Sequence, residues 1–436
     1  MERSIWKSLR QGALPLVMGG HWAAALSPTV QLNLGWFWLD GVLANASDST
    51  VLAYLPLFAL ALGASRAQIG LMDAFSNLSA ALVLLSGAAI VERWGHRKRI
   101  CLVSGGGVAR LALLAAAMVP LAFHGPLAVH ALITLAVLRV ALANVALPAW
   151  VSLTADIVPV AWRGRFFAAR NMAMGIVGMV VTYLVGLLIT FTGGLAGYQL
   201  AMSLAFAVGM ASTWAFAHIQ EPATTADAQT IEPAPRMPMR RHLRDHPGFL
   251  AFCAVGALWN FSLNISGPFF NVYIVEILGA SAGVIGALGV VSSLAALPGQ
   301  RLFGVWADRW GPRRVLAFTG LLIPLIPWGL MLARSPWHAA PINALGGFLW
   351  AGFNLANFNF LLVLTPPDRR PRYTALYQIV VTVALSLGAM LGGVVASRWG
   401  YQPIFIASGV GRLLATVLLL LLIHKPRPTN ELTKVG

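Results

Sequence analysis

The most regular feature of the chain is a succession of long apolar stretches separated by short polar connections. A helix needs about 20 mostly apolar residues to cross a hydrocarbon layer about 30 Å thick. Windows of that length predict twelve spanning helices. They lie at residues 31–62, 66–90, 100–121, 127–151, 166–192, 197–219, 248–278, 282–305, 313–333, 337–364, 373–397 and 401–424. A transmembrane β-barrel needs short segments of alternating polarity, and runs such as LLATVLLLLLI (413–423) do not alternate.

One connection differs from the others in length and composition. Residues 220–247 carry several prolines and few large apolar side chains, which is typical of a linker. We therefore predict an all-α membrane protein in which 31–219 and 248–424 each form a six-helix bundle. Residues 1–30 are expected to form a cytoplasmic N-terminal segment with an interfacial helix, and 425–436 a cytoplasmic tail.

The composition agrees with a membrane protein and excludes other classes. The chain is 58% hydrophobic and only 10% charged, whereas a soluble domain has about 25% charged residues. Disorder requires low hydrophobicity, and two cysteines do not make a disulfide scaffold. The formal net charge of +16 remains to be explained.

The positive charges are concentrated in alternate connections. Lysines and arginines cluster at both termini and after every even-numbered span; the cluster after the fourth is Arg163, Arg165 and Arg170. The other connections hold only Arg66, Arg334 and Arg398. By the positive-inside bias, both termini and the linker are expected to be cytoplasmic in a plasma (inner) membrane. Basic runs beside spans are expected to meet anionic lipid headgroups, not nucleic acid.

Short sequence repeats relate the two halves. LGAS occurs at 62–65 and again at 278–281, and ERWGHRKR (92–99) recurs as DRWGPRRV (308–315) at the same separation. Tandem six-helix halves related by an axis along the membrane normal are a transporter architecture, with the substrate bound between the halves near the middle of the membrane.

The second copy of this repeat, GVWADRWGPRR (304–314), resembles the signature of the major facilitator superfamily, and AAIVERWGHRKR (88–99) is a variant with Ala88 and Glu92 at two signature positions. The resemblance is to bacterial-type members and implies alternating access by rocking of the two halves. It also implies a cytoplasmic gate; the alternative is that the same charges act only on topology. The gate residues would be Glu92, Arg93, Gly95, Arg97, Gly304, Asp308, Arg309, Gly311 and Arg313.

Six ionisable residues fall inside the predicted spans, where they are costly and usually face a cavity or a partner. They are Asp40, Asp48, Asp73, Arg110, Arg139 and Arg412, and their charges cancel. Asp40 and Asp48 differ by about 80° on a helix and can face one cavity. The segment LAVLRVALANVALP (135–148) resembles the family's arginine motif in helix 4, common among proton-coupled exporters. We hypothesise that Asp40, Asp48 or Asp73 binds a proton or a cationic substrate beside Arg139; the alternative is permanent ion pairs that fix helix packing.

The spans of the second half carry amides and aromatic rings, with Glu276 near one end as their sole acid. Asn264 is the repeat equivalent of Asp48, which predicts an amide and an acid facing each other across a central cavity. Such side chains suit a ligand with an apolar body and a few polar groups, and they also serve as interhelical hydrogen-bonding groups. The candidate cavity residues are Trp36, Asn45, Asn77, Trp259, Asn260, Asn264, Asn354 and Asn357.

No phosphate-binding loop, HExxH or GxSxG motif occurs, so we expect neither enzymatic activity nor a cofactor or metal. The sequence predicts a monomeric secondary active transporter that exports an amphiphilic or drug-like compound in exchange for protons. One alternative is uptake or uniport of a neutral metabolite such as a sugar. Another is a transport-inactive membrane sensor or scaffold with the same fold.

Overall fold

The computed structural model describes residues 26–221, 247–365 and 370–422, and all the regular secondary structure of these residues is helical. In the first half the spanning units are α3 (Pro28–Ala61), α4 (Arg66–Trp94), α5 (Arg97–Ile100) with η2 (Cys101–Val108) and α6 (Ala109–Ala122), α7 (Pro126–Ile157), α8 (Arg163–Thr192) and α9 (Gly194–Ala217). The short η3 (Val160–Trp162) precedes α8. The predicted interfacial helix, most of the linker and the tail lie outside the described residues.

In the second half the spanning units are α11 (Pro247–Asn264) with η4 (Gly267–Phe269) and α12 (Phe270–Glu276), α13 (Ala282–Trp310), α14 (Pro312–Leu322) with α15 (Leu325–Leu332), α16 (Ala339–Leu364) after η5 (Pro336–His338), α17 (Arg370–Trp399) and α18 (Tyr401–Leu422). The prediction of an all-α protein with twelve spanning units is confirmed.

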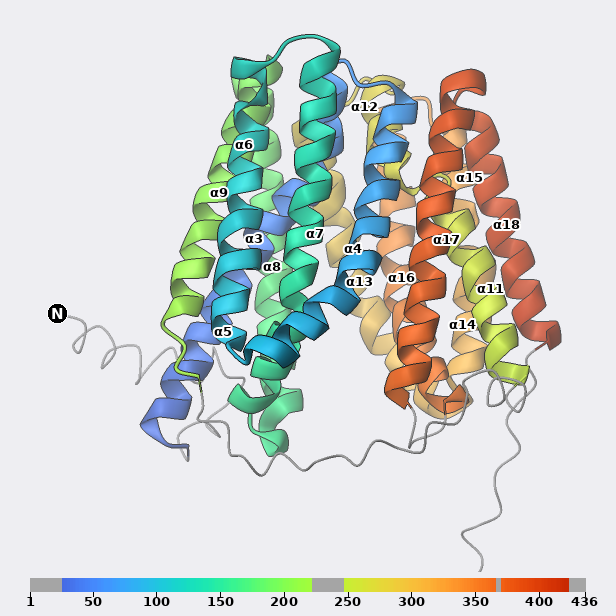
Figure 1. Ribbon diagram of the computed structural model, residues 1–436. Coiled ribbons are helices and arrows are strands. Elements are labelled where there is room, and N and C mark those ends of the chain that lie inside the picture. Colours follow the sequence, from blue (N-terminus) through green and yellow to red (C-terminus); the bar gives the residue numbers. More distant parts are fainter. Residues whose placement is uncertain (1–25, 222–246, 366–369, 423–436) are drawn as a thin grey trace, which may run out of the picture.

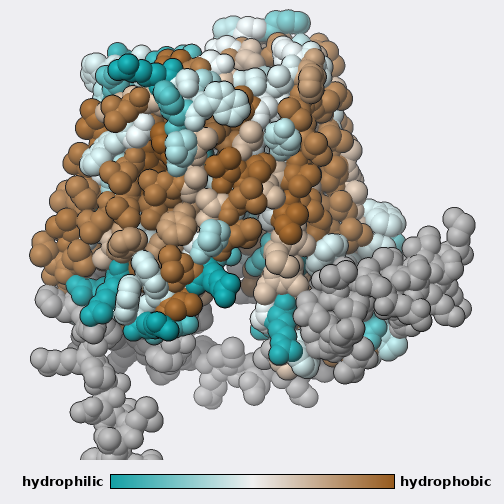
Figure 2. All heavy atoms as spheres, turned by 180° about the vertical axis from the view of Figure 1, so that it is seen from behind, coloured by the Kyte–Doolittle hydropathy of each residue, from teal (hydrophilic) through white to brown (hydrophobic). Residues whose placement is uncertain are grey.

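Ten units are long and apolar enough to cross a membrane. The remaining two, α3 and α16, have 34 and 26 residues. Their hydropathy is lowered by polar side chains, namely Asp40 and Asp48 on α3 and several asparagines on α16. Apolar side chains cover the flanks of the molecule and hydrophilic ones gather at its two ends (Figure 2), as expected for a protein surrounded by lipid.

Three spanning units are interrupted, which the apolar pattern alone did not predict. The third unit has a π-helical turn over Cys101–Val108, which contains three consecutive glycines, Gly105 to Gly107. The seventh unit breaks after Asn264, just before Gly267 and Pro268, and the ninth breaks at Pro324. Proline lacks the N–H that a continuous helix needs, so the break leaves backbone carbonyls free for other partners.

The helices form two groups side by side, α3 to α9 and α11 to α18 (Figure 1). We call the end where α9 finishes and α11 begins the linker end, and the opposite end the far end. The two groups meet through α4 with α17 and α8 with α13. At the linker end the molecule is hollowed between them (Figure 2). The described conformation is therefore closed at the far end and open at the linker end.

Glycines allow the two halves to touch at the far end. A Cβ atom on Gly70 of α4 would lie 2.5 Å from the carbonyl oxygen of Ala389 and 2.8 Å from the Cα atom of Gly393 on α17. Gly286 of α13 meets the backbone of Tyr183 on α8 in the same way. The hydroxyl of Tyr54 donates to the Thr182 carbonyl oxygen at 2.6 Å and lies 3.3 Å from that of Ala282, so it spans both halves.

We predict that Gly70→Ala opens the far end. The added methyl group meets backbone atoms that cannot rotate away, and overpacking of this kind costs about 1–3 kcal/mol, a shift of roughly tenfold in population. Spin labels on His124→Cys and Trp337→Cys, at the far-end connections of the two halves, report the distance in pulsed electron resonance; the native cysteines are buried. We expect a larger population at long distance.

Gly175→Ala is the matched control, because a Cβ atom on Gly175 meets nothing within 4 Å. It should leave the distance distribution unchanged. A wild-type distribution in Gly70→Ala would show that the glycine contact does not hold the far end closed.

Candidate functional site

Asp48 lies in a cluster with two arginines of its own half. Its Oδ1 atom is 3.1 Å from Nη1 of Arg110 and 3.5 Å from Nη2 of Arg139. Arg110 also donates to the Ser47 hydroxyl at 2.8 Å. The Asp48 side chain is 53% exposed, whereas the two arginine side chains are 11% and 15% exposed. Asp48 is thus a cavity-facing acid with counter-charges beside it.

Asp40 belongs to a second, more buried group nearer the linker end. Its Oδ1 atom accepts a hydrogen bond from the Ser212 hydroxyl at 2.7 Å, and Oδ2 lies 3.9 Å from Nη2 of Arg170. Arg170 donates to the Phe37 carbonyl oxygen at 3.1 Å and stacks over the Phe37 ring. Arg170 was counted with the basic connection after the fourth span, although the predicted span 166–192 contains it. In the structure it lies within α8 and is 5% exposed.

Asp73 is bonded to amides of both halves. Its Oδ2 atom accepts hydrogen bonds from Asn77 at 2.9 Å, on the same helix, and from Asn264 at 2.6 Å, on α11 of the other half. The Asn264 amide also donates to the Leu385 carbonyl oxygen of α17 at 2.9 Å. Within the described part of the chain Asp73 forms no salt bridge. The repeat suggested that Asn264 faces Asp48; the structure bonds it to Asp73.

Two adjoining cavities surround Asp48. One, of about 720 Å³, is lined by Asp40, Asp48 and Arg110 among others, and the other, of about 880 Å³, by Asn45, Asp48, Asp73 and Arg139. Asp40 and Asp48 therefore line one cavity, and Asp48 and Asp73 another. All four predicted coupling residues, Asp40, Asp48, Asp73 and Arg139, line this pair of cavities, which share the Asp48 side chain.

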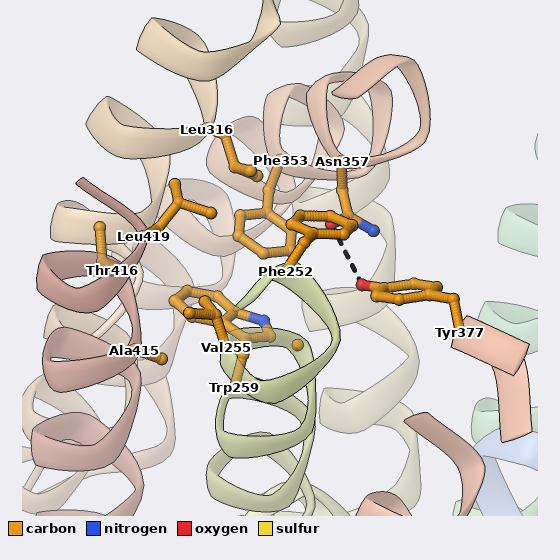
Figure 3. Close-up of a pocket in the computed structure, with 11 residues that line it drawn as sticks. Phe252, Val255, Trp259, Leu316, Phe353, Asn357, Tyr377, Ala415, Thr416 and Leu419 are labelled. Carbon is orange, nitrogen blue, oxygen red and sulfur yellow. Dashed lines mark hydrogen bonds between the residues drawn. The ribbon is translucent and has the colours of Figure 1, made fainter. Parts of the chain in front are cut away.

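An aromatic pocket of about 310 Å³ lies within the second half (Figure 3). The Trp259 ring stacks on Phe353 with centroids 4.3 Å apart, and the Tyr377 hydroxyl donates to Asn357 at 3.3 Å. Figure 3 shows Trp259 and Phe353 facing each other and the Tyr377–Asn357 bond at one side. Two predicted cavity residues, Trp259 and Asn357, thus meet here, apart from the acids.

Among the other predicted cavity residues, Asn45 lines one of the Asp48 cavities, whereas Trp36, Asn260 and Asn354 are not among the residues that line the cavities described above. Trp36 stacks on His218 of α9, with ring centroids 4.6 Å apart, near the linker end. Asn45 donates to the Met174 carbonyl oxygen of α8 at 2.7 Å, and Asn260 to Gly256 of its own helix at 2.8 Å. Asn354 is exposed on α16.

The predicted gate motif lies at the linker end, where the halves are apart. Gly95 and Gly311 have positive φ angles of 65° and 83°, which glycine adopts without strain, and each ends its helix. The first copy pairs within its own half: Arg97 lies 2.5 Å from Asp156 and 3.2 Å from Glu221.

The second copy makes different contacts. Arg313 donates to the Leu420 carbonyl oxygen of α18 at 2.7 Å, whereas Asp308, Arg309 and Arg93 are exposed. Gly304 lies inside α13, where a Cβ atom would meet only Leu355, at 4.0 Å. The side chain of Glu92 lies outside the described set.

A polar contact at the far end was not predicted. Arg66 of α4 forms a salt bridge of 2.7 Å with Glu276 of α12, and Glu276 also accepts a hydrogen bond from the Tyr401 hydroxyl. The Arg66 guanidinium lies 4.3 Å from the centroid of the Tyr401 ring. The sequence signal that could have predicted this contact is that Arg66 and Glu276 belong to opposite halves and both lie on the side of the membrane that carries few charges.

The family model of the Major Facilitator Superfamily matches residues 37–270 and 256–435. The chain therefore belongs to this superfamily and is a secondary transporter, not an enzyme. Among the described residues no group of three metal-binding side chains occurs.

Three curated relatives have printed functions. The chain is 28% identical over 191 residues to the efflux pump patC of Aspergillus clavatus, covering 39% of the chain and 33% of the pump. It is 30% identical over 143 residues to the multidrug resistance protein MdtG of Proteus mirabilis, covering 32% and 35%. A putative sugar efflux transporter of Deinococcus radiodurans is 23% identical over 411 residues, covering 88% of the chain and 97% of that protein.

Solved structures share the fold at low identity. A point mutant of the nucleoside transporter NupG superposes with a TM-score of 0.73 at 12% identity, covering 90% of the chain and 100% of that structure. A bacterial homologue of the human lysosomal transporter Spinster, in an inward-facing and occupied conformation, has a TM-score of 0.68 at 14% identity, covering 91% and 97%. These likenesses show the Major Facilitator fold.

We predict that Asp48→Asn destabilises the first half. The substitution removes the negative charge from Arg110 and Arg139, which stay buried; because Asp48 itself is half exposed, the expected loss is modest, about 1–2 kcal/mol. Thermal unfolding in detergent measures it.

Asp308→Asn is the matched control, since Asp308 is exposed, and it should leave the unfolding temperature unchanged. Equal losses in the two variants would contradict a stabilising role for the Asp48 cluster.

Proposed function

We propose that this transporter exports small amphiphilic compounds in exchange for protons, and that Asp73 is the proton-coupling residue. The observation that carries the proposal is the bond from Asp73 to Asn264, because it joins the two halves in the far-end-closed conformation. A change in the charge of Asp73 therefore acts directly on a contact that alternating access has to break.

The orientation follows from the basic residues. We assign the linker end to the cytoplasm, because the positive charges concentrate in the connections at that end. The described conformation is then inward-facing, and the cavities around Asp48 open toward the cytoplasm, where an exporter collects its cargo.

Asp73 is better suited to proton coupling than Asp48. Its described partners are amides, so a proton neutralises it without leaving a cation unpaired. Protonation of Asp48 would instead leave Arg110 and Arg139 without their counter-charge. We assign Asp48 to the electrostatics of the substrate cavity, together with Arg139.

The export direction is supported by the relatives, whose printed functions include efflux and multidrug resistance. Sugar export is a second candidate, favoured by the Deinococcus protein because the match covers 97% of it. An amphiphilic compound is preferred here because the cavity beside Asp48, Asp73 and Arg139 also has apolar walls, among them Val51, Leu52 and Leu55.

We predict that Asp73→Asn abolishes coupling while retaining transport. Asparagine preserves the size and the hydrogen bonding of this side chain but does not titrate. In proteoliposomes, uphill efflux of ethidium, Nile red and fluorescein under a pH gradient should fall to the leak rate for whichever dye is transported. Exchange of that dye at equal concentrations on both sides should continue.

Asp48→Asn separates the two roles, because it should reduce uphill efflux and exchange together. Full pH-driven efflux by Asp73→Asn would refute the assignment of coupling to Asp73. Transport of radiolabelled glucose or lactose, with none of the three dyes, would favour the sugar candidate.

A further inference from the structure

Arg412 is a buried cation in the middle of the second half. It lies on α18, eleven residues after Tyr401, which starts the helix at the far end; at 1.5 Å per residue this is about 16 Å along the helix, near the centre of the hydrocarbon layer. The residue is 1% exposed. A guanidinium at this depth requires compensation of its charge.

The partners of Arg412 are all neutral. Its Nη2 atom donates to the Ser408 hydroxyl at 2.7 Å, to Ser266 at 3.3 Å and to the Leu263 carbonyl oxygen at 3.4 Å. The Nε atom is buried with no hydrogen-bond partner. Arginine carries five N–H donors in a planar fork; all the described bonds of Arg412 use Nη2, and Nε makes none.

Among the described residues no acid neutralises Arg412. No described carboxylate forms a salt bridge with it. Between residues 247 and 422 the chain has three acids, Glu276, Asp308 and Asp368. Glu276 is bound to Arg66 and Tyr401, Asp308 is exposed at the linker end, and Asp368 lies outside the described residues.

The spans of the whole protein likewise contain more arginines than aspartates. In the first half, Asp48 is paired with Arg110 and Arg139, and Asp40 with Arg170. Because Arg170 also lies inside a span, α8, the interior of the spans contains four arginines and three aspartates, whereas the sequence predicted three of each. Arg412 is the arginine among these four that has no aspartate beside it, which leaves room for one negative charge from outside the protein.

Arg412 also lines a cavity able to hold an organic molecule. The cavity measures about 750 Å³ and is lined by residues of α11, α12, α13, α15, α16 and α18. Asn271 and Asn343 contribute amides to its wall, and Phe270 and Trp350 contribute aromatic rings. A cation, two amides and two rings suit a ligand with an acidic group and an apolar body.

We propose that Arg412 binds the carboxylate of an anionic amphiphile, whose apolar body lies against Phe270 and Trp350. This proposal rests on the function proposed above and narrows the cargo to organic acids. Arg412 lines this cavity and has no described counter-charge, so a carboxylate bound there would supply the negative charge that the guanidinium lacks.

The test uses equilibrium binding, which needs no pH gradient. Thermal unfolding of the purified full-length protein is measured with naphthoate and with its neutral amide, naphthamide. Naphthoate should stabilise the wild type at concentrations where naphthamide does not. Arg412→Gln should weaken naphthoate binding roughly tenfold to a hundredfold, and Arg412→Lys should retain part of it.

Arg334→Gln is the matched control, since it removes an arginine that is exposed at the far end, and it should bind naphthoate like the wild type. If Arg412→Gln does not fold, Asn271→Leu and Trp350→Ala test the same cavity and should weaken naphthoate binding.

Three results would overturn the proposal. They are equal stabilisation by naphthamide, undiminished naphthoate binding in Arg412→Gln, and full stabilisation by chloride alone with no further effect of naphthoate. Naphthoate binding does not depend on Asp73, so the two proposals can fail separately. If pH-driven efflux is observed but Arg412 does not bind naphthoate, only the organic-acid assignment is rejected. Loss of pH dependence with intact naphthoate binding would reject proton coupling alone.

Discussion

The hydrogen bond between the Asp73 carboxylate and the Asn264 amide is the polar centre of the contact between the two halves. Around it the backbones approach closely, because glycines on α4, α13 and α17 leave no side chain in the way. Apolar surfaces in lipid gain little from association, so such contacts depend on packing and on the few polar bonds within them. The closed far end and the open linker end both follow from where this contact lies along α4.

The two halves share a fold but differ in their interior chemistry. The first half holds paired acids and arginines around cavities shared by Asp48, whereas the second holds aromatic rings, amides and one arginine. The repeat symmetry therefore holds for the arrangement of the helices but not for the side chains that line the cavities. In the two proposals above, Arg412 of the second half recognises the acidic group of the solute, and Asp73 of the first half takes up the proton.

The sequence predicted the helices well because spanning length and apolar composition are local properties. Because ionisable residues are rare in spans, the sequence also singled out Asp40, Asp48, Asp73 and Arg139. The structure places all four on the walls of the two cavities that share Asp48, and their role in coupling stays a prediction. The sequence did not predict partners. Asn264 was placed opposite Asp48 by repeat symmetry, whereas in the structure its amide donates to Asp73 and to the Leu385 carbonyl oxygen. Arg170 was assigned to a connection because the cluster around it is basic, whereas its partner in the structure, Asp40, lies more than a hundred residues earlier.

The break in the seventh unit has a mechanical consequence. Leu263 and Asn264 are neighbours at the end of α11; the carbonyl oxygen of the first accepts a hydrogen bond from Arg412, and the side chain of the second donates to Asp73. Two consecutive residues thus contact a buried cation, Arg412, in their own half and a buried acid, Asp73, in the other half. Any rotation of this turn would therefore change both contacts together.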